Sequence, residues 1–542
     1  MKPRILGQAA ALLATCTLAH TALSAPGLVN PSFNDDGTGV ADPLGWKSIG
    51  VVAADFTEWG GHFDDDHRLS HWSTEDYFVE TIQEVRGLRP GWYTLRGWAR
   101  RSTGDNNAYL ELDCGGEPER VAVPVAWPNQ WLEVTVSAQA KRGKCAIRLH
   151  TDAAGGEWTN FDDIRLVPGR VRLPIRGADV SSLTKSEDFG GEYSSDFGKK
   201  HHKKHHGHHW SRPSALEILK EHGTTHLRVR VWVDPADGYH DIIEIAEMAR
   251  RAKHEGLELL VDLHYSDFWA DPGQQTVPAA WADFSMEELE AAVYDHTFEV
   301  CMAIRDQGMA PDMIQLGNEL NSGMLWPHGH TWDPPNWENL GRLLKAGHSA
   351  VRDCSRRTKV VLHLAEGGNN GAFRWWFDNI MAQGVEFDII AASYYGYWHG
   401  SLGDLQYNLN DVAEHYDKDV MVVETAYPFT LDGVDTTHNI IGLPEQLVPG
   451  YPATPEGQAR NLRDVLSIVR AVPGGRGLGV FYWDATWTAV PGNGWDPTDP
   501  ASGNAWENQA LFDFDERALP AMSEFLVDME KVTRRPQRCW FW

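Results

Sequence analysis

Positive charge and long apolar runs are both scarce in this chain. Its 48 Lys and Arg residues are outnumbered by 76 Asp and Glu residues, which leaves a formal net charge of -28 at pH 7. A surface of that sign repels nucleic acid and anionic membranes, so neither is expected as a partner. Beyond the N-terminus no segment approaches the roughly 20 apolar residues of a membrane span. A neutral substrate is the easiest partner to accommodate.

Cysteine is rare as well, with only six residues in the chain. No Cys-x-x-Cys spacing occurs, so a zinc ribbon or a dithiol redox motif has no support. We expect disulfides between cysteines that share one predicted domain or lie on consecutive predicted helices. Among the five cysteines beyond residue 25, these pairs are Cys114 with Cys145 and Cys301 with Cys354, and Cys539 is left over.

The N-terminus has the composition of a targeting segment. Residues 1–25 join the basic Lys2 and Arg4 to an apolar stretch that ends in small residues, which predicts a secretory signal peptide. We therefore expect a secreted protein. At the other end, residues 536–542 form a tail, and its Cys539-Trp-Phe-Trp sequence has no assigned role.

Residues 26–168 alternate apolar and polar positions in short runs that Gly, Pro, Asn and Asp interrupt. A period of two, with turn signals about 8 to 12 residues apart, predicts an antiparallel β-sandwich. Its opening Asn30-Pro-Ser-Phe-Asn and its closing Trp158-Thr-Asn-Phe-Asp-Asp resemble the ends of the galactose-binding-like jelly rolls found in carbohydrate-binding modules. Flat indole rings stack on sugars, and one or two of the domain's tryptophans should be exposed for this. The candidates are Trp59, Trp72, Trp98, Trp127 and Trp158.

Residues 169–535 change to a repeat of strand and helix. Helix-like stretches such as 241–252 place apolar residues at i, i+3 and i+4, and they separate eight strand-like runs. Eight such units in about 360 residues predict a (β/α)8 TIM barrel. The fold class is therefore α/β, with a β-sandwich in front of the barrel. The expected strands lie near 177–182, 225–233, 257–264, 312–319, 359–364, 387–395, 420–427 and 478–484.

Two glutamates stand at the ends of expected strands. Glu319 closes the fourth run and Glu424 the seventh, and carboxylates at these ends point into the active-site mouth of a barrel. Hydrolysis of a glycosidic bond with retention needs an acid and a nucleophilic carboxylate roughly 5 to 5.5 Å apart. The two residues could instead be structural charges. Asn318 before Glu319 and the aromatic residues around both segments favour catalysis.

Several segments in the barrel region form one characteristic set. They are Gly177-Ala-Asp-Val-Ser-Ser, Leu227-Arg-Val-Arg-Val-Trp-Val-Asp-Pro, Asp262-Leu-His-Tyr-Ser-Asp-Phe-Trp-Ala-Asp-Pro-Gly, Gln315-Leu-Gly-Asn-Glu, Ser393-Tyr-Tyr-Gly-Tyr-Trp-His-Gly, Val423-Glu-Thr-Ala-Tyr-Pro and Asn508-Gln-Ala-Leu-Phe-Asp. Together these segments resemble glycoside hydrolase family 53, the endo-β-1,4-galactanases of clan A. The resemblance covers residues from about 174 to 530. One departure is Gly396, where the family usually has Pro.

The resemblance implies roles for these residues. Glu319 would be the general acid/base and Glu424 the nucleophile, and the chemistry asks that the pKa of the acid exceed that of the nucleophile. Asn318 would bind the sugar 2-hydroxyl. Arg230 is expected to pair with the nucleophile and keep it ionised. Further residues expected to line the cleft are His264, Asp267, His363 and Tyr395, with Trp269, Trp326, Trp398 and Trp483 as sugar-stacking residues.

A structural calcium ion is a further implication of the resemblance, because bacterial members of the family carry one between the loops after strands seven and eight. Carboxylate and amide oxygens suit this hard cation. A pair of solvated acidic loops is the alternative. The candidate ligands are Asp432, Asp435, His438 and Asn439 in the first loop and Asn504 and Glu507 in the second.

The histidine-rich segment 201–209 could chelate a transition metal, but a solvated insertion is favoured. A metal-dependent hydrolase is disfavoured because the strand-end residues pair as carboxylates.

Together these features predict a secreted, monomeric endo-β-1,4-galactanase that acts with retention on galactan or type I arabinogalactan, with the sandwich anchoring it to polysaccharide. One alternative is a clan A hydrolase of another β-linked polymer, such as mannan or xylan. The other is a catalytically inactive polysaccharide-binding protein.

Overall fold

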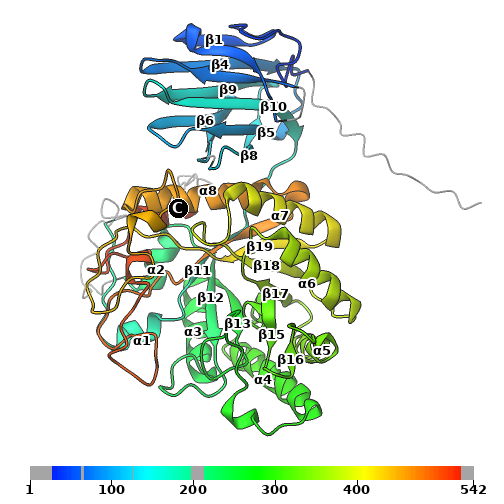
Figure 1. Cartoon of the computed structure of the whole chain (residues 1–542), viewed down its shortest axis with the longest axis vertical. Coiled ribbons are helices and arrows are strands. Elements are labelled where there is room, and N and C mark those ends of the chain that lie inside the picture. The colour runs from blue at the N-terminus through cyan, green and yellow to red at the C-terminus, as the bar shows by residue number, and fades with distance from the viewer. Residues whose placement is uncertain (1–26, 63–65, 126, 197–212, 527–542) are drawn as a thin grey trace, which may run out of the picture.

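Two structural units follow one another along the chain, a β-sandwich and a barrel (Figure 1). The structure is a computed structural model, and it describes residues 27–62, 66–125, 127–196 and 213–526. The expected signal peptide, the histidine-rich segment 201–209 and the tail 536–542 lie outside the described residues. Among the described helices, none combines the length and the apolar character that crossing a bilayer requires.

The sandwich consists of two antiparallel five-stranded sheets, as predicted. The first has the order β1 (Lys47–Gly50), β4 (Tyr77–Arg86), β9 (Lys144–Ala153), β6 (Asn106–Asp113) and β7 (Glu119–Ala122). The second has the order β2 (Asp55–Trp59), β3 (His67–Trp72), β10 (Trp158–Pro168), β5 (Gly91–Arg101) and β8 (Leu132–Ala140). Alternating residues such as Leu95, Leu110, Leu149 and Phe161 fill the space between the sheets and are fully buried. The predicted disulfide Cys114–Cys145 is present in this unit.

The second unit is a closed barrel of eight parallel strands, which confirms the predicted fold. Its strands are β11 (Ile175–Asp179), β12 (His226–Val231), β13 (Glu258–Leu263), β14 (Met313–Leu316), β17 (Lys359–Leu364), β18 (Ile389–Ser393), β19 (Asp419–Glu424) and β20 (Gly477–Tyr482). Its helices are α1 (Leu183–Asp188), α2 (Ala215–Glu221), α3 (Ile242–Glu255), α4 (Met286–Asp306), α5 (Trp337–Cys354), α6 (Asn370–Ala382), α7 (Leu402–Tyr416) and α8 (Pro455–Ala471). A short hairpin, β15 (Gly323–Met324) and β16 (Gly329–His330), follows β14. The second predicted disulfide, Cys301–Cys354, joins α4 to α5.

Local sequence explains where the helices begin. Asp241 accepts hydrogen bonds from the first amides of α3, and α4 and α7 each start with a capping box on Ser285 or Ser401. Such caps satisfy amides that have no partner inside the helix. Gly256 ends α3 with a φ of 66°, a conformation that glycine adopts without a steric penalty.

The inward side chains of the barrel strands change character along each strand. Near the amino ends they form an apolar cluster that includes Leu260, Met313 and Val361. Two residues further along the same strands come Asp262, Gln315 and His363, all fully buried. Because side chains on one face of a strand recur with a period of two, these polar groups lie directly above the apolar plug. The polar half of the interior therefore faces the carboxyl ends of the strands.

The sandwich is docked on the barrel through β8, an edge strand of its second sheet (Figure 1). The side chain of Gln406 in α7 pairs with both backbone groups of Glu133: it accepts from the N–H at 2.8 Å and donates to the carbonyl at 2.9 Å. Arg96 donates to the carbonyl of Ala471 at 2.6 Å. Val125 and Leu132 belong to the same buried cluster as the barrel helices. The edge strand is thereby covered, which removes an exposed row of unpaired backbone groups.

Candidate active site

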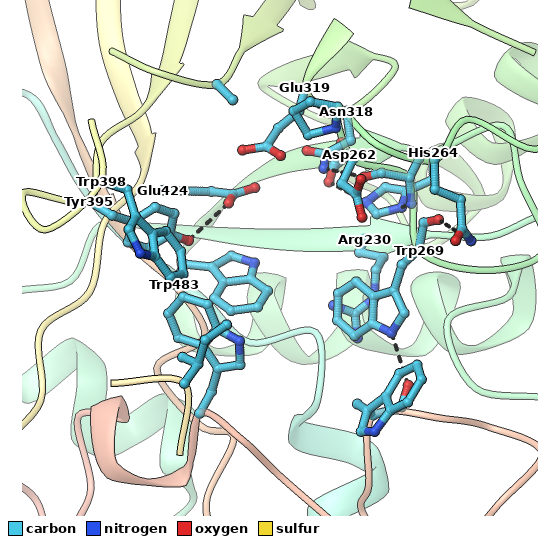
Figure 2. A pocket seen from close by; sticks show the side chains of 18 of the residues that line it. Arg230, Asp262, His264, Trp269, Asn318, Glu319, Tyr395, Trp398, Glu424 and Trp483 are labelled. Atoms are coloured by element: carbon cyan, nitrogen blue, oxygen red, sulfur yellow. Dashed lines mark hydrogen bonds and ion pairs between the residues drawn. The ribbon is translucent and has the colours of Figure 1, made fainter. Parts of the chain in front are cut away.

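A cavity of about 600 Å³ opens at the carboxyl ends of the barrel strands. Glu319 and Glu424 both line it, and Figure 2 shows their carboxylates pointing toward one another. Of the other residues expected at the site, the following also line it: Arg230, His264, Trp269, Asn318, Tyr395, Trp398 and Trp483. The fold thus gathers these seven residues, from five separate sequence segments, around the two glutamates.

The sequence suggested that Glu319 is the last residue of the fourth strand. In the structure it lies three residues beyond the end of β14. Gly317 (φ 81°) and Glu319 itself (φ 47°) turn the chain sharply after the strand. A left-handed conformation is uncommon for glutamate and is held here by the surrounding structure. Ser393 at the end of β18 donates a hydrogen bond to its Oε1 at 2.6 Å.

Burial and the neighbouring Glu424 carboxylate raise the pKa of Glu319 to about 8, while the Ser393 hydrogen bond acts in the opposite direction. Burial disfavours the charged form of Glu319 because water is removed from the carboxylate, and Glu424 disfavours it because like charges repel. Glu319 therefore keeps its proton at neutral pH.

Glu424 is the last residue of β19, and its surroundings favour the opposite charge state. Its Oε1 lies 2.8 Å from Arg228, and its Oε2 accepts a hydrogen bond from Tyr395 at 3.0 Å. Burial, together with the charges of Asp262 and Asp179, raises the pKa of Glu424 above its usual value, while the Arg228 charge and the Tyr395 hydrogen bond act to lower it. Since Glu319 has no cation in direct contact, the single proton of the pair resides on Glu319 and Glu424 is ionised.

Arg228, and not Arg230, pairs with Glu424. Both arginines belong to β12 and both are buried, but the guanidinium of Arg230 lies over the ring of Trp269, 3.9 Å from its centroid. Arg230 also contacts His240 at 3.0 Å. The expected ion pair of Arg230 with the nucleophile is therefore wrong. Arg230 instead supports the wall of the cavity.

The Arg228 guanidinium sits among three carboxylates. Besides Glu424 it contacts Asp179 at 2.8 Å and Asp262 at 2.9 Å, and all four side chains are almost completely buried. Burial alone would raise the pKa of Asp262, but Arg228 and His264 hold it below its usual range. A buried charge needs such paired partners to remain ionised.

Asn318 is fixed in one orientation by this network. Its Oδ1 accepts from Arg228 at 2.9 Å and contacts His363 Nδ1 at 3.0 Å, and its amide donates to the carbonyl of Ala270 at 2.8 Å. An asparagine amide has two N–H donors. One of them is thus used by the protein, while the side chain as a whole lines the cavity.

Three of the expected cleft residues do not line this cavity. His363 is fully buried below it and contacts Ser393 at 2.8 Å. Asp267 accepts hydrogen bonds from backbone amides of the surrounding loops. Trp326 donates its indole N–H to the carbonyl of Ser322 at 2.9 Å. His363 and Asp267 do lie at or just beyond strand ends, as expected, but the polar groups of all three residues bond to the protein itself.

The walls of the cavity are more aromatic than the sequence suggested. Trp269 donates its indole N–H to the carbonyl of Trp495, so two distant loops meet here (Figure 2). Trp398 is half exposed, whereas Trp483 is buried except for its edge. The tryptophans that sequence reasoning missed are Trp487, Trp495 and Trp506. Their position in the long loop after β20 was the signal that could have identified them.

The two loops proposed to hold calcium do meet, and they are joined by direct hydrogen bonds. The amide of Val434 donates to Glu507 at 2.6 Å, and the amide of Asn504 donates to Asp435 at 2.6 Å. Glu507 Oε2 and Asn439 Oδ1 are buried and find no hydrogen-bond partner among the residues that the structure describes. By contrast, Asp432 and His438 are exposed. Within the described ranges, no three His, Cys, Asp or Glu side chains are grouped to hold a metal ion.

The cavity can thus support acid/base chemistry on a neutral, ring-shaped substrate. A protonated carboxyl group faces an ionised carboxylate, and aromatic faces surround both. This is the arrangement that glycosidic bond cleavage requires.

Comparison with known proteins places the barrel in a family. The model of glycosyl hydrolase family 53 matches residues 175–525. An endo-beta-1,4-galactanase of Bacillus subtilis is 34% identical over 396 residues, which cover 67% of this chain and 87% of the relative. An arabinogalactan endo-beta-1,4-galactanase of Cellvibrio japonicus is 34% identical over 369 residues, which cover 65% of this chain and 91% of the relative. The solved GH53 catalytic domain of Ignisphaera aggregans has a TM-score of 0.60 and 40% identity, and the match covers 66% of this chain and 97% of that domain.

The charge states of the two glutamates predict a bell-shaped pH profile. Glu319 must be protonated to act as an acid, so kcat/KM should fall as the pH rises through about 8. Because the Ser393 hydrogen bond stabilises ionised Glu319, Ser393→Ala should shift this alkaline limb upward by about one pH unit, or about 1.4 kcal/mol. The acidic limb, set by Glu424, should stay in place.

A matched control is Ser322→Ala, because Ser322 donates to the carbonyl of Pro272 and not to a carboxylate. The control should leave both limbs unchanged. An alkaline limb that stays or moves downward in Ser393→Ala would contradict the assignment of the proton to Glu319.

Proposed function

The chain belongs to glycosyl hydrolase family 53, and we propose that it is an endo-β-1,4-galactanase that cleaves galactan or type I arabinogalactan with retention of configuration. The observation that carries this proposal is the pair Glu319 and Glu424. The two carboxyl groups face one cavity in opposite charge states. The galactanase relatives support the choice of a β-1,4-linked galactose polymer.

In the first step, the Glu424 carboxylate attacks the anomeric carbon while Glu319 gives its proton to the leaving glycosidic oxygen. The bond between the anomeric carbon and that oxygen breaks, and an ester bond to Glu424 forms. In the second step, Glu319 accepts a proton from water, and the resulting hydroxide equivalent attacks the anomeric carbon. The ester bond breaks, Glu424 is ionised again, and the product keeps the β configuration.

Arg228 and Tyr395 prepare Glu424 for this attack. Their contacts at 2.8 and 3.0 Å fix both carboxylate oxygens. Burial and the charge of Glu424 raise the pKa of Tyr395 well above its usual range, so Tyr395 stays a neutral donor. When Glu424 loses its charge in the ester, Arg228 is still balanced by Asp179 and Asp262. The network therefore tolerates both charge states of the nucleophile.

The remaining groups bind the substrate. The second N–H of Asn318 is directed to the 2-hydroxyl of the reacting sugar, a contact that strengthens in the transition state. Trp269, Trp398 and Trp483 offer apolar ring surfaces to the C–H faces of the sugars. A neutral substrate also suits the acidic chain, because no charged group needs to be desolvated on binding.

We further propose that the protein acts outside the cytoplasm and that the sandwich contacts the polysaccharide. Two disulfides, Cys114–Cys145 and Cys301–Cys354, fit an oxidising compartment. Three indole rings on the sandwich are exposed, at Trp59, Trp72 and Trp127, which is more than the one or two expected. Such rings fit contact with sugar rings.

The direct test of the proposed function is reducing-sugar release from purified β-1,4-galactan beside mannan and xylan. Only galactan should be cleaved, and Glu424→Ala should lower the rate by about 10⁴-fold or more. Cleavage of mannan or xylan alone would keep the mechanism and refute the substrate. Absence of cleavage on every polymer would favour a binding protein.

A structural calcium ion is a separate proposal. Glu507 Oε2 and Asn439 Oδ1 are buried oxygens without partners among the described residues, and calcium accepts such ligands. Asp435, on the loop that Glu507 contacts, would add a second carboxylate. When bound, the ion would join the loops after β19 and β20.

Calcium removal should therefore destabilise the protein without abolishing the chemistry. Adding EDTA should lower the thermal midpoint, excess Ca²⁺ should restore it, and Glu507→Gln should weaken the Ca²⁺ dependence of that midpoint. A thermal midpoint of the wild-type protein that changes with neither EDTA nor Ca²⁺ would refute the calcium site.

A further inference from the structure

We propose that the sandwich domain completes the substrate cleft: its Trp127 and the barrel residue Trp398 form an additional sugar-binding subsite next to the catalytic cavity. The inference rests on the proposed function, because the ligand is a galactosyl residue of the same chain that Glu319 and Glu424 cleave. It differs from the idea of a remote anchor on the sandwich, because it assigns the contact to a position in the cleft itself.

A second cavity, of about 300 Å³, lies between the two units. On the sandwich side it is lined by Trp127 and Pro128, and on the barrel side by Gly396, Trp398 and Ser401. Trp398 lines the catalytic cavity as well. One indole ring is therefore shared by the two cavities, and a chain that leaves the catalytic cavity past Trp398 meets Trp127 next.

Both indole rings are accessible to a ligand. Trp127 is 52% exposed and Trp398 is 49% exposed, although tryptophan is usually highly buried. Gly396 adds no side chain to the cavity between them. Exposed aromatic faces beside an open cavity are costly in water unless a partner covers them, and sugar rings are flat enough to do so.

The loop that carries Trp127 is fixed to the barrel, so the subsite is built before substrate arrives. Ser401 donates a hydrogen bond to Gln130 Oε1 at 2.5 Å, and Gln130 in turn donates to Asp404 at 3.3 Å. Ser401 also begins α7, directly after the loop with Trp398. These hydrogen bonds thus tie the loop that carries Trp127 to the start of α7, next to the loop that carries Trp398.

A close fit on the other side of the loop adds to this rigidity. Val125 lies against Gly450, where a Cβ atom would come within 2.6 Å of the valine side chain. Gly450 also has a φ of 88°, which favours glycine. A fixed loop avoids the entropy that ordering it on binding would cost.

The chemistry of the cavity selects a neutral sugar. Asp404 lines it and carries a negative charge that repels anionic sugars such as uronic acids. The hydroxyl of Ser401 and the side chain of Asn461 supply polar contacts. Galactose has an axial 4-hydroxyl, which leaves a continuous patch of C–H groups on one ring face for stacking on an indole.

The test compares Trp127→Ala with the wild-type protein on long galactan and on the short β-1,4-galactotriose, which we expect to occupy the catalytic cavity without reaching Trp127. Loss of one stacking contact should lower kcat/KM on long galactan about tenfold and shift the product lengths. Turnover of galactotriose should be unchanged. Trp375→Ala is a matched control, because Trp375 on α6 is 48% exposed and lines neither of the two cavities. This control should behave like the wild-type protein.

The opposite results are equally clear. Wild-type kinetics for Trp127→Ala on long galactan would overturn the subsite, as would an equal loss in Trp375→Ala, which would indicate an effect common to exposed tryptophans. A loss on galactotriose as large as on galactan would mean that the variant damages the catalytic cavity. If the wild-type protein does not cleave galactan, the proposed function fails, and this inference fails with it.

Discussion

The ion-pair network of Arg228 is the interaction on which the active site depends. A guanidinium buried with Asp179, Asp262 and Glu424 would be very unfavourable without these partners, and each carboxylate would be unfavourable without the guanidinium. The network is possible because β12 places Arg228 opposite Asp179 of the neighbouring strand β11, inside the barrel. Fold stability and charge placement are therefore linked at one side chain.

The same network separates the roles of two chemically identical residues. Glu424 contacts a cation and a phenol hydroxyl, whereas Glu319 accepts the Ser393 hydroxyl and is repelled by its neighbour, and the charge of Arg228 acts on it least. The contrast in pKa follows from environment alone. A barrel can provide that contrast because each strand end delivers a different side chain to one cavity.

Much of this arrangement could be predicted from sequence, because strand periodicity and strand ends are local properties. The eight strands, both disulfides and the meeting of Glu319 with Glu424 were predicted from short segments. The choice between Arg228 and Arg230 was not, because both face inward and only the stagger across the barrel decides which one reaches Glu424. The contact of Trp127 with the cleft also escaped prediction, since no sequence pattern tells how a sandwich docks on a barrel.

The most direct test of the account is the configuration of the products that azide forms with an activated aryl β-galactoside and two variants. In Glu424→Ala, azide should take the place of the nucleophile and give the α-galactosyl azide. In Glu319→Ala, azide should attack the sugar bound to Glu424 and give the β-galactosyl azide. The reverse pattern, or wild-type hydrolysis by either variant, would contradict the assignment of nucleophile and acid on which the account is built.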